Sequence, residues 1–421
     1  MRIKISIRKR SVDHGRSRTT KGNRNHRHHH RFNSILTSNS TKIHPSSDFH
    51  SKDTDQVNTF HKKIKKTKLH QWMKKGCLIG FISSVLLTIC IICALLFSRK
   101  SNSINKLILL RWNSTGVTIA GLTGQSGSNA SQLNAPWDIA LDSSNNFYVS
   151  DQTNHRVQKF IKDSSIGITV AGYGNGSSGT NLSALRNPLG IVLDENQNVY
   201  IADVSNQRIV CWSNGASVGS LIAGNGTIGN TSNLLNSPYG LAYDRNSKTI
   251  YSTEYYNYRV LRFYRNNSTG TLITGGNGLG LNSTQLYWPH AIHFDSLTNT
   301  LLIVNAGANN VVRSIINSTE WTFVLGDLNG LSGNSSSELA SPTDVTVDPM
   351  GNIYVVDRNN HRIQFFSMDS LINGTTIAGK GTVSGSNATL LKTPSSLTLD
   401  NQLNLYVADR GNHRIQKFER Y

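Results

Sequence analysis

From residue 116 onward, short apolar runs alternate with turns rich in Asn, Gly and Ser. The runs are rich in β-branched and aromatic residues, which is typical of strands bounded by turns. Each unit of the pattern contains L-x-x-P followed six residues later by Asp, and the prolines are Pro136, Pro188, Pro238, Pro289, Pro342 and Pro394. Their spacing of 50 to 53 residues predicts six copies of one structural unit.

Each unit contains four such runs in the same order. The first follows the proline, the second ("FYVSD", "VYIAD") closes at an acidic residue, the third ("RVQKF") follows an N-H-R type turn, and the fourth ("ITVAG") ends in Gly. Four short runs joined by turns predict a four-stranded antiparallel meander. Because such a sheet is apolar on both faces, it must pack against its neighbours. The fold class expected for residues 116–421 is therefore all-β, a six-bladed β-propeller.

The sixth unit contains only three runs, which raises the question of its fourth strand. The run "GVTIAG" (Gly116 to Gly121) has a fourth-strand sequence with no first three strands before it. We expect Val117 to Gly121 to pair with Arg414 to Phe418, which would close the ring and leave no open sheet edge.

The repeat resembles the NHL repeat, which is found in six-bladed propellers. The resemblance rests on the pattern P-x-G-I-x-x-D, [IV]-Y-V-A-D and N-H-R-I-Q-K-F, and it covers essentially all of residues 116–421. Units 1, 5 and 6 match best, whereas unit 4 departs, with Asn305 where an acidic residue is expected. We expect the repeated Asp, Asn-His and Arg positions to hold the scaffold, since a carboxylate at a strand end can accept bonds across the following turn.

A different pattern precedes the repeats. Gly76 to Ser98 comprises 23 residues without a charge, and a helix of that length would extend roughly 34 Å, enough to cross a bilayer core. This predicts a transmembrane signal anchor. Residues 1–75 lack periodicity and predict a disordered basic tail, and residues 99–115 predict a linker.

Charge gives the expected orientation. The 20 residues before the apolar run hold seven Lys, and the 20 after it hold four Lys and Arg. The positive-inside rule therefore predicts a single-pass type II protein at the plasma membrane or in the secretory pathway, with a cytoplasmic N-terminus and an extracellular or lumenal propeller. N-x-[ST] sequons suit that placement and predict glycosylation. The sites considered are Asn113, Asn129, Asn175, Asn181, Asn225, Asn282, Asn317, Asn334, Asn373 and Asn387.

Composition narrows the function classes. The formal charge of +19 lies almost wholly in residues 1–75, with 20 Lys and Arg against 4 Asp and Glu, whereas residues 116–421 hold 19 against 20. We therefore expect no nucleic-acid binding by the propeller, although some NHL propellers bind RNA through a basic face. Four cysteines, three of them in or beside the apolar run, provide no disulfide framework.

Candidate binding residues surround one mouth of the expected channel. The first strand of each blade lines the channel of a propeller, and aromatic residues there suit contact with a protein or glycan. Packing between blades explains some of these aromatic side chains equally well. The candidates are Trp137, Asp138, Tyr239, Tyr255, Tyr256, Tyr258, Trp288, His290 and Asp344.

The expected function is a membrane-anchored module that binds a protein or glycan ligand, without catalysis, cofactor or metal. The alternative is a propeller enzyme. The resemblance extends to peptidyl-hydroxyglycine α-amidating lyases, which hold zinc with three histidines, but only His290 and His293 lie outside the N-H-R turns of the repeats. Calcium-dependent lactonases and related hydrolases use channel Asp, Glu and Asn, for which Asp138 and Asp344 are the candidates.

Overall fold

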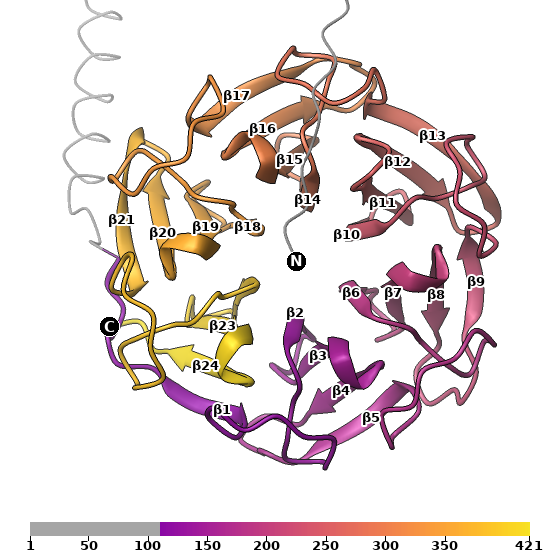
Figure 1. Ribbon diagram of the computed structural model, residues 1–421, viewed down its shortest axis with the longest axis horizontal. Helices are drawn as coiled ribbons and strands as arrows, with labels where there is room; N and C mark the ends of the chain where they lie inside the picture. The colour runs from indigo at the N-terminus through magenta and orange to yellow at the C-terminus, as the bar shows by residue number, and fades with distance from the viewer. Residues whose placement is uncertain (1–109) are drawn as a thin grey trace, which may run out of the picture. The chain divides into compact units, whose positions relative to one another are not determined.

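The structure is a computed structural model that describes residues 110–421, and it contains six four-stranded antiparallel sheets arranged in a ring (Figure 1). Blade 1 comprises β2 (Pro136–Leu141), β3 (Phe147–Asp151), β4 (Arg156–Phe160) and β5 (Gly167–Gly172). Blade 2 comprises β6 (Pro188–Leu193), β7 (Val199–Asp203), β8 (Arg208–Trp212) and β9 (Ser220–Ala223). Blade 3 comprises β10 (Pro238–Asp244), β11 (Thr249–Glu254), β12 (Arg259–Tyr264) and β13 (Asn267–Gly275).

The remaining blades follow the same plan. Blade 4 comprises β14 (Pro289–Asp295), β15 (Thr300–Asn305), β16 (Asn310–Ile315) and β17 (Trp321–Gly326). Blade 5 comprises β18 (Asp344–Val347), β19 (Ile353–Asp357), β20 (Arg362–Ser367) and β21 (Ser370–Gly379). Blade 6 comprises β22 (Ser396–Leu399), β23 (Leu405–Asp409), β24 (Arg414–Phe418) and β1 (Val117–Gly121). The expected all-β, six-bladed propeller is confirmed.

The ring closes in blade 6, as expected. β1 pairs with β24 in antiparallel register, with Val117 opposite Lys417 and Gly121 opposite Arg414. Gly121 has φ +79°, and a Cβ there would lie 2.2 Å from the His413 carbonyl oxygen. Glycine is therefore required where β1 meets the turn of blade 6.

The hydrophobic core lies between blades. Six buried clusters each combine side chains from two neighbouring blades, for example Tyr200 and Ile209 of blade 2 with Leu241 and Phe263 of blade 3. A blade therefore contributes one face to each of two clusters, which is why the chain needs a closed ring to bury its apolar residues.

The second and third strands of each blade are joined by a short turn held by a buried polar network. In blade 1, Asp151 accepts hydrogen bonds from Asn154 Nδ2 at 2.8 Å and from Arg156 Nε at 2.9 Å, and the Arg156 guanidinium donates to carbonyl groups of the preceding loop, including that of Ser128. The equivalent acidic and Arg side chains pair in blades 2, 3, 5 and 6. These repeated residues thus hold the scaffold.

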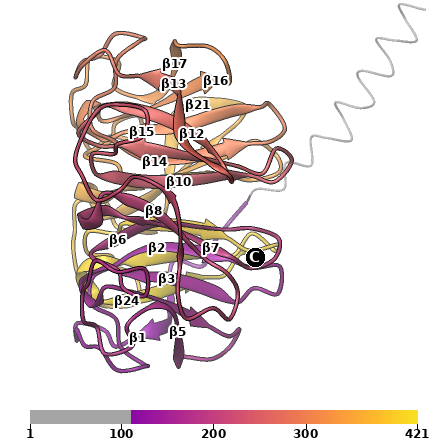
Figure 2. The same cartoon turned by 90° about the vertical axis from the view of Figure 1, so that its right-hand side faces the viewer.

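These turns are 3-10 helical in every blade except blade 3: η1 (Gln152–Asn154), η2 (Val204–Asn206), η3 (Ala306–Ala308), η4 (Arg358–Asn360) and η5 (Arg410–Asn412). Blade 4 keeps the conformation without the ion pair, since Asn305 and Asn310 replace the charged residues. Figure 2, at right angles to Figure 1, shows the turns along one face of the ring.

The sequence also predicts a linker, a membrane span and a tail before the repeats. Trp112, expected in the linker, is buried against Tyr354 with ring centroids 5.6 Å apart, and its indole donates to the Leu403 carbonyl at 2.8 Å. No helix in residues 110–421 is long and apolar enough to cross a membrane. The expected span Gly76–Ser98 and the expected tail, residues 1–75, lie outside the described residues.

Candidate functional site

Two rings of equivalent positions surround the channel at the face that carries the 3-10 turns, which we call the mouth face. The inner ring is the residue after each repeat proline: Trp137, Leu189, Tyr239, His290, Thr343 and Ser395. The outer ring is the first residue after the second strand of each blade: Gln152, Val204, Tyr255, Ala306, Arg358 and Arg410. Because each blade places the same backbone at these positions, their side chains determine how the blades differ at the mouth.

Trp137 of blade 1 reaches across the inner ring. Its ring stacks on His290 of blade 4 with centroids 5.3 Å apart and an interplanar angle of 21°, and it meets Tyr239 of blade 3 edge-on at 6.3 Å. His290 is 7% exposed. Burial and the nearby charge of Arg358 lower the pKa of His290 to about 3, so this imidazole is neutral near pH 7.

A stack of aromatic rings continues outward over blades 3 and 4. Tyr239 and Tyr255 are stacked at 4.6 Å, Tyr255 and Trp288 are parallel at 5.9 Å, and Tyr256 meets Tyr255 edge-on at 4.9 Å. Trp288 has φ +51°, a left-handed conformation immediately before a proline, which turns its side chain toward the turn of blade 3. We call these rings, with Trp137 and His290, the mouth cluster.

The mouth cluster presents polar atoms to solvent. Tyr256 is 54% exposed and Trp288 is 37% exposed. Within residues 110–421 the hydroxyl groups of Tyr239, Tyr255 and Tyr256 and the indole N–H groups of Trp137 and Trp288 have no hydrogen-bond partner. Tyr258, the remaining tyrosine expected here, packs instead against the core between blades 3 and 4.

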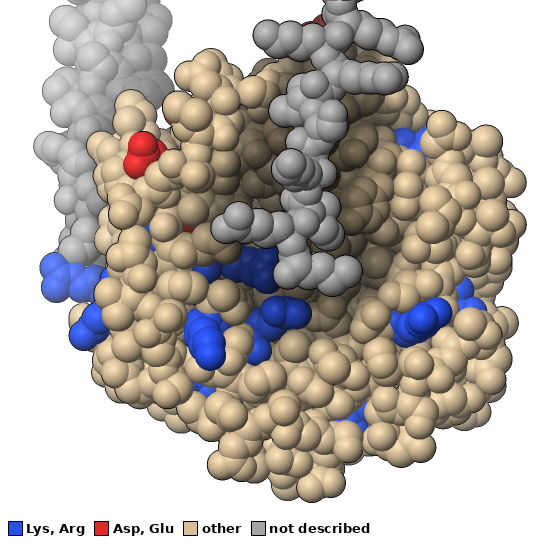
Figure 3. Space-filling view, viewed as in Figure 1, with Lys and Arg blue, Asp and Glu red and all other residues tan. Residues whose placement is uncertain are grey.

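The other side of the mouth is basic. The guanidinium groups of Arg358 and Arg410 lie 5.8 and 5.3 Å from the centroid of the Trp137 ring. Basic side chains gather beside the central hollow in Figure 3. The sequence pattern does not single out these arginines, because each follows a strand-closing Asp that belongs to the scaffold. Comparison of the six outer-ring positions identifies them.

Below Trp137, two carboxyl groups face the channel. Asp138 accepts from the Ile191 N–H at 2.8 Å and the Ser396 hydroxyl at 2.6 Å, and Asp344 accepts from the Leu397 N–H at 2.9 Å. Burial raises the pKa of Asp138 to about 6, and burial with the neighbouring Asp138 charge raises the pKa of Asp344 to about 8. The structure therefore brings together two residues that lie on non-adjacent blades.

The space beside these carboxyl groups is small. The cavity lined by Trp137, Asp138, His290 and Asp344 holds about 30 Å³, room for a single water molecule. The first strands of neighbouring blades approach closely at Gly190 and Gly240, because a Cβ on either glycine would lie within 2.6 Å of a carbonyl oxygen of the next blade. This close approach leaves a narrow channel.

No group of three His, Cys, Asp or Glu side chains converges as a metal site among residues 110–421. His290 stacks on Trp137, whereas His293 lies by Thr346 of β18, with Nδ1 and Oγ1 3.4 Å apart. Burial lowers the pKa of His293 to about 4. The two histidines that lie outside the turns are thus engaged in separate contacts.

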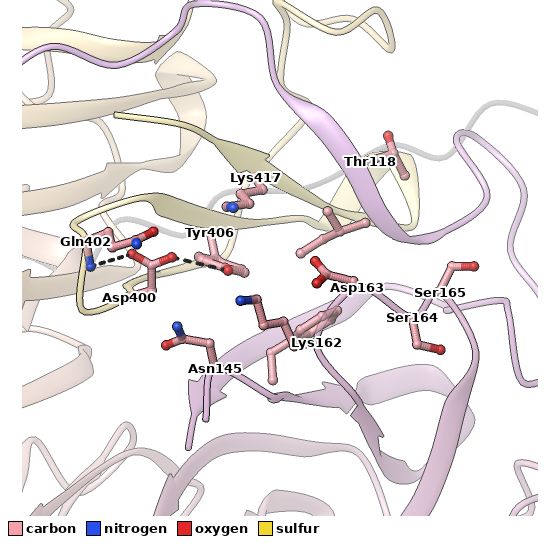
Figure 4. A pocket seen from close by; sticks show the side chains of 12 residues that line it. Thr118, Asn145, Lys162, Asp163, Ser164, Ser165, Asp400, Gln402, Tyr406 and Lys417 are labelled. Atoms are coloured by element: carbon pink, nitrogen blue, oxygen red, sulfur yellow. Dashed lines mark hydrogen bonds between the residues drawn. The ribbon is translucent and has the colours of Figure 1, made fainter. Parts of the chain in front are cut away.

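A larger hollow of about 300 Å³ lies between blades 6 and 1 at the opposite ends of the strands (Figure 4). Its polar lining is partly paired: Asp400 accepts from the Tyr406 hydroxyl at 3.4 Å and from the Gln402 N–H at 2.9 Å. Lys162 and Lys417 also line it. Phe147 and Tyr406 belong to the core cluster between these blades, so we assign this hollow to blade packing.

The sequon residues all lie on the surface. The ten asparagine side chains considered for glycosylation are exposed: Asn113, Asn129, Asn175, Asn181, Asn225, Asn282, Asn317, Asn334, Asn373 and Asn387. Each is therefore accessible to a modifying enzyme.

Comparison with known proteins supports the repeat assignment. The NHL repeat model matches residues 133–160, 185–212, 339–366 and 391–418, which are in blades 1, 2, 5 and 6. The chain is 30% identical over 122 residues to NHL repeat-containing protein 3 of Mus musculus, a match that covers 27% of this chain and 33% of that protein. The chain thus spans about a third of the length of this relative.

Solved structures share the fold at low sequence identity. A protein of unknown function from Bacteroides thetaiotaomicron is 17% identical with a TM-score of 0.58, covering 73% of this chain and 76% of its own. An auxiliary nutrient binding protein from the same organism is 16% identical with a TM-score of 0.56, over 74% and 77%. A gluconolactonase from Xanthomonas campestris is 13% identical with a TM-score of 0.51, over 73% and 97%. The chain therefore carries NHL repeats and folds as a six-bladed propeller.

Proposed function

We propose that the propeller is a binding module that docks a protein partner on its mouth face. The observation that carries this proposal is the mouth cluster, where Tyr256 and Trp288 are exposed and several hydroxyl and indole groups have no partner in the described part of the chain. Tyrosine, tryptophan and arginine are the residue types that dominate binding energy at protein interfaces.

The distribution of the mouth cluster supports a specific role. Tyr239, Tyr255 and Tyr256 belong to blade 3, and Trp288 and His290 to blade 4. These are the two blades that the NHL repeat model does not match. Departures from the repeat thus coincide with the aromatic half of the mouth, as expected if a ligand rather than the ring required them.

A second candidate function is a propeller enzyme of the lactonase type. The channel carboxyl pair favours it, because two acids with separated, raised pKa values are typical of catalytic sites. The size of the cavity argues against an enzyme, since the volume of about 30 Å³ beside the two carboxyl groups leaves no room for an organic substrate under Trp137. Lactone hydrolysis that is lost in Asp344→Asn would favour the enzyme over the binding module.

We also propose that the module is displayed outside the cytoplasm by a single-pass type II anchor at Gly76–Ser98. The support is the apolar run itself, the excess of Lys before it and the exposure of the sequon asparagines. A propeller in that compartment would meet extracellular or lumenal proteins and not nucleic acid.

Site-specific photocrosslinking tests the docking face. A photoreactive amino acid at Tyr256 places the reagent in the mouth cluster, and the same residue at Tyr264, which is 44% exposed at the other end of the strands, is the matched control. We expect discrete crosslinked proteins from the Tyr256 position in the full chain expressed in cells, and none of these species from the Tyr264 position. Identical species from both positions would contradict a docking site at the mouth.

A further inference from the structure

Arg358 and Arg410 are charged groups without an opposite charge. Neither forms an ion pair within residues 110–421. Arg358 Nε is buried with no hydrogen-bond partner, and Arg410 donates only to the neutral Gln152 side chain, at 3.1 Å from its Nη2. The scaffold arginines differ, because each of them contacts an acidic side chain at 2.7 to 3.1 Å.

The two arginines share one platform, the Trp137 ring, so their like charges repel. Burial lowers the pKa of Arg358, and burial followed by the neighbouring charge of Arg358 lowers the pKa of Arg410. Neither arginine forms an ion pair with Asp138 or Asp344 among residues 110–421. An added anion would relieve the repulsion, and partial burial would strengthen the attraction.

The donors at the mouth also limit the kind of ligand. Guanidinium and indole groups only donate hydrogen bonds, so a ligand here must present acceptors. A carboxylate matches the fork of a guanidinium and can accept two parallel bonds. The aromatic half next to it, with Tyr255 and Trp288, provides the apolar contact area that a peptide segment needs.

We propose that Arg358 and Arg410 form the anion-binding half of the mouth and bind a carboxylate of an acidic segment in a partner protein. This inference rests on the proposed docking function and identifies the chemistry of the partner. Trp137 serves as the platform, since its ring holds both guanidinium groups beside the aromatic half.

The test uses the full chain, a fluorescein-labelled peptide of alternating glycine and glutamate, and the same peptide with glutamine, followed by fluorescence anisotropy. Because the basic segment 1–75 attracts any acidic peptide, the comparison is between variants. Arg358→Gln/Arg410→Gln removes two charges at the mouth, and Lys162→Gln/Lys417→Gln removes two at the hollow on the opposite side. Thermal unfolding identifies a variant that fails to fold. Arg358→Lys/Arg410→Lys then replaces the glutamine variant, and it should also bind the glutamate peptide more weakly than the wild type, because lysine lacks the guanidinium fork.

We expect Arg358→Gln/Arg410→Gln to bind the glutamate peptide about tenfold more weakly, the loss expected for one charge-assisted contact. The control Lys162→Gln/Lys417→Gln should change this affinity by less than about twofold. An equal loss of affinity in the mouth variant and in the control, or no loss in either, would overturn the inference. An oligogalacturonate bound more tightly than the glutamate peptide, with the same dependence on arginine, would overturn the assignment to a protein partner. If the crosslinks from Tyr256 persist in the arginine variant, the docking function stands and this inference alone fails.

Discussion

At the scale of residues, the three histidines of the N-H-R turns connect blades 1, 5 and 6 to the next blade. Nδ1 of His155 accepts the Asn187 N–H at 3.1 Å, and His361 and His413 make the same contact. In blade 2 the Gln207 side-chain oxygen takes this role at 2.7 Å. The imidazole must therefore be neutral for the contact to form, and burial lowers the pKa of all three histidines.

This link predicts a pH dependence. A histidine whose pKa is lowered on folding stabilises the fold less as the pH falls below its unfolded value of about 6.5, because the unfolded chain then binds more protons. The triple variant His155→Gln/His361→Gln/His413→Gln keeps an acceptor that does not titrate, as Gln207 shows. We expect its melting temperature to match that of the wild type near pH 7.5 and to exceed it near pH 5. A constant difference at both pH values would contradict the role of Nδ1.

For the carboxyl pair in the channel, the expected pH dependence of stability has the opposite sign. The pKa of Asp344 is raised to about 8 on folding, so its contribution to stability is largest at low pH and is lost as the pH rises toward 8. Asp344→Asn removes the charge and keeps an acceptor for the Leu397 N–H. We expect the variant to melt above the wild type at pH 8 and to lose that advantage at about pH 5, as measured by calorimetry. An advantage that grows at low pH would disprove the charge repulsion.

Residue types alone located only part of the mouth. Trp137, Tyr239, Tyr255 and His290 could be placed because they follow a repeat proline or a strand-closing acid, and equivalent positions in a ring face the same way. Arg358 follows a strand-closing Asp that the repeat pattern assigns to the scaffold, so the sequence places it at the mouth only when the six outer-ring positions are compared. That it has no carboxylate to pair with is visible only in three dimensions.

At the scale of elements, the strands could be predicted because each blade repeats the same apolar runs. Ring closure could be predicted because the sixth unit lacks a fourth run and the first run of the propeller is the one that belongs to no other unit. The burial of Trp112 could not be predicted, since a lone tryptophan outside the repeats has no period to indicate what it packs against. β1 makes closure testable within one strand: Ala120 is 1% exposed between blades 6 and 1, and Val117 is 60% exposed.

We therefore expect Ala120→Glu to lower the free energy of unfolding by about 3 kcal/mol or more, because it buries an unpaired charge. The melting temperature should fall by at least about 6 °C. Val117→Glu, on the same strand, should change stability by no more than about 0.5 kcal/mol. Equal effects of the two substitutions on chemical denaturation would show that β1 does not close blade 6.

At the scale of the whole molecule, the exposed sequons and the apolar run predict where the propeller is displayed. In microsomes, endoglycosidase should increase the mobility of the full chain, and Asn225→Gln, Asn317→Gln and Asn373→Gln should each remove one step of that shift. All three asparagines are exposed: Asn225 lies between blades 2 and 3, Asn317 in the turn between β16 and β17, and Asn373 on β21. Unmodified asparagines at all three positions, in a chain that is inserted in the membrane, would contradict a lumenal propeller.

The central claim is that the ring serves as a scaffold and the mouth face as the binding site. The most direct measurement is the affinity of a partner identified through Tyr256 for the wild type, for Tyr256→Ala/Trp288→Ala and for the control Tyr264→Ala/Leu297→Ala, whose side chains are exposed at the opposite strand ends. Loss of two exposed aromatic anchors should weaken binding by about 2 kcal/mol or more, roughly thirtyfold, and the control should change it by less than about twofold. Unchanged affinity in the mouth variant, with a weakened control, would contradict the claim.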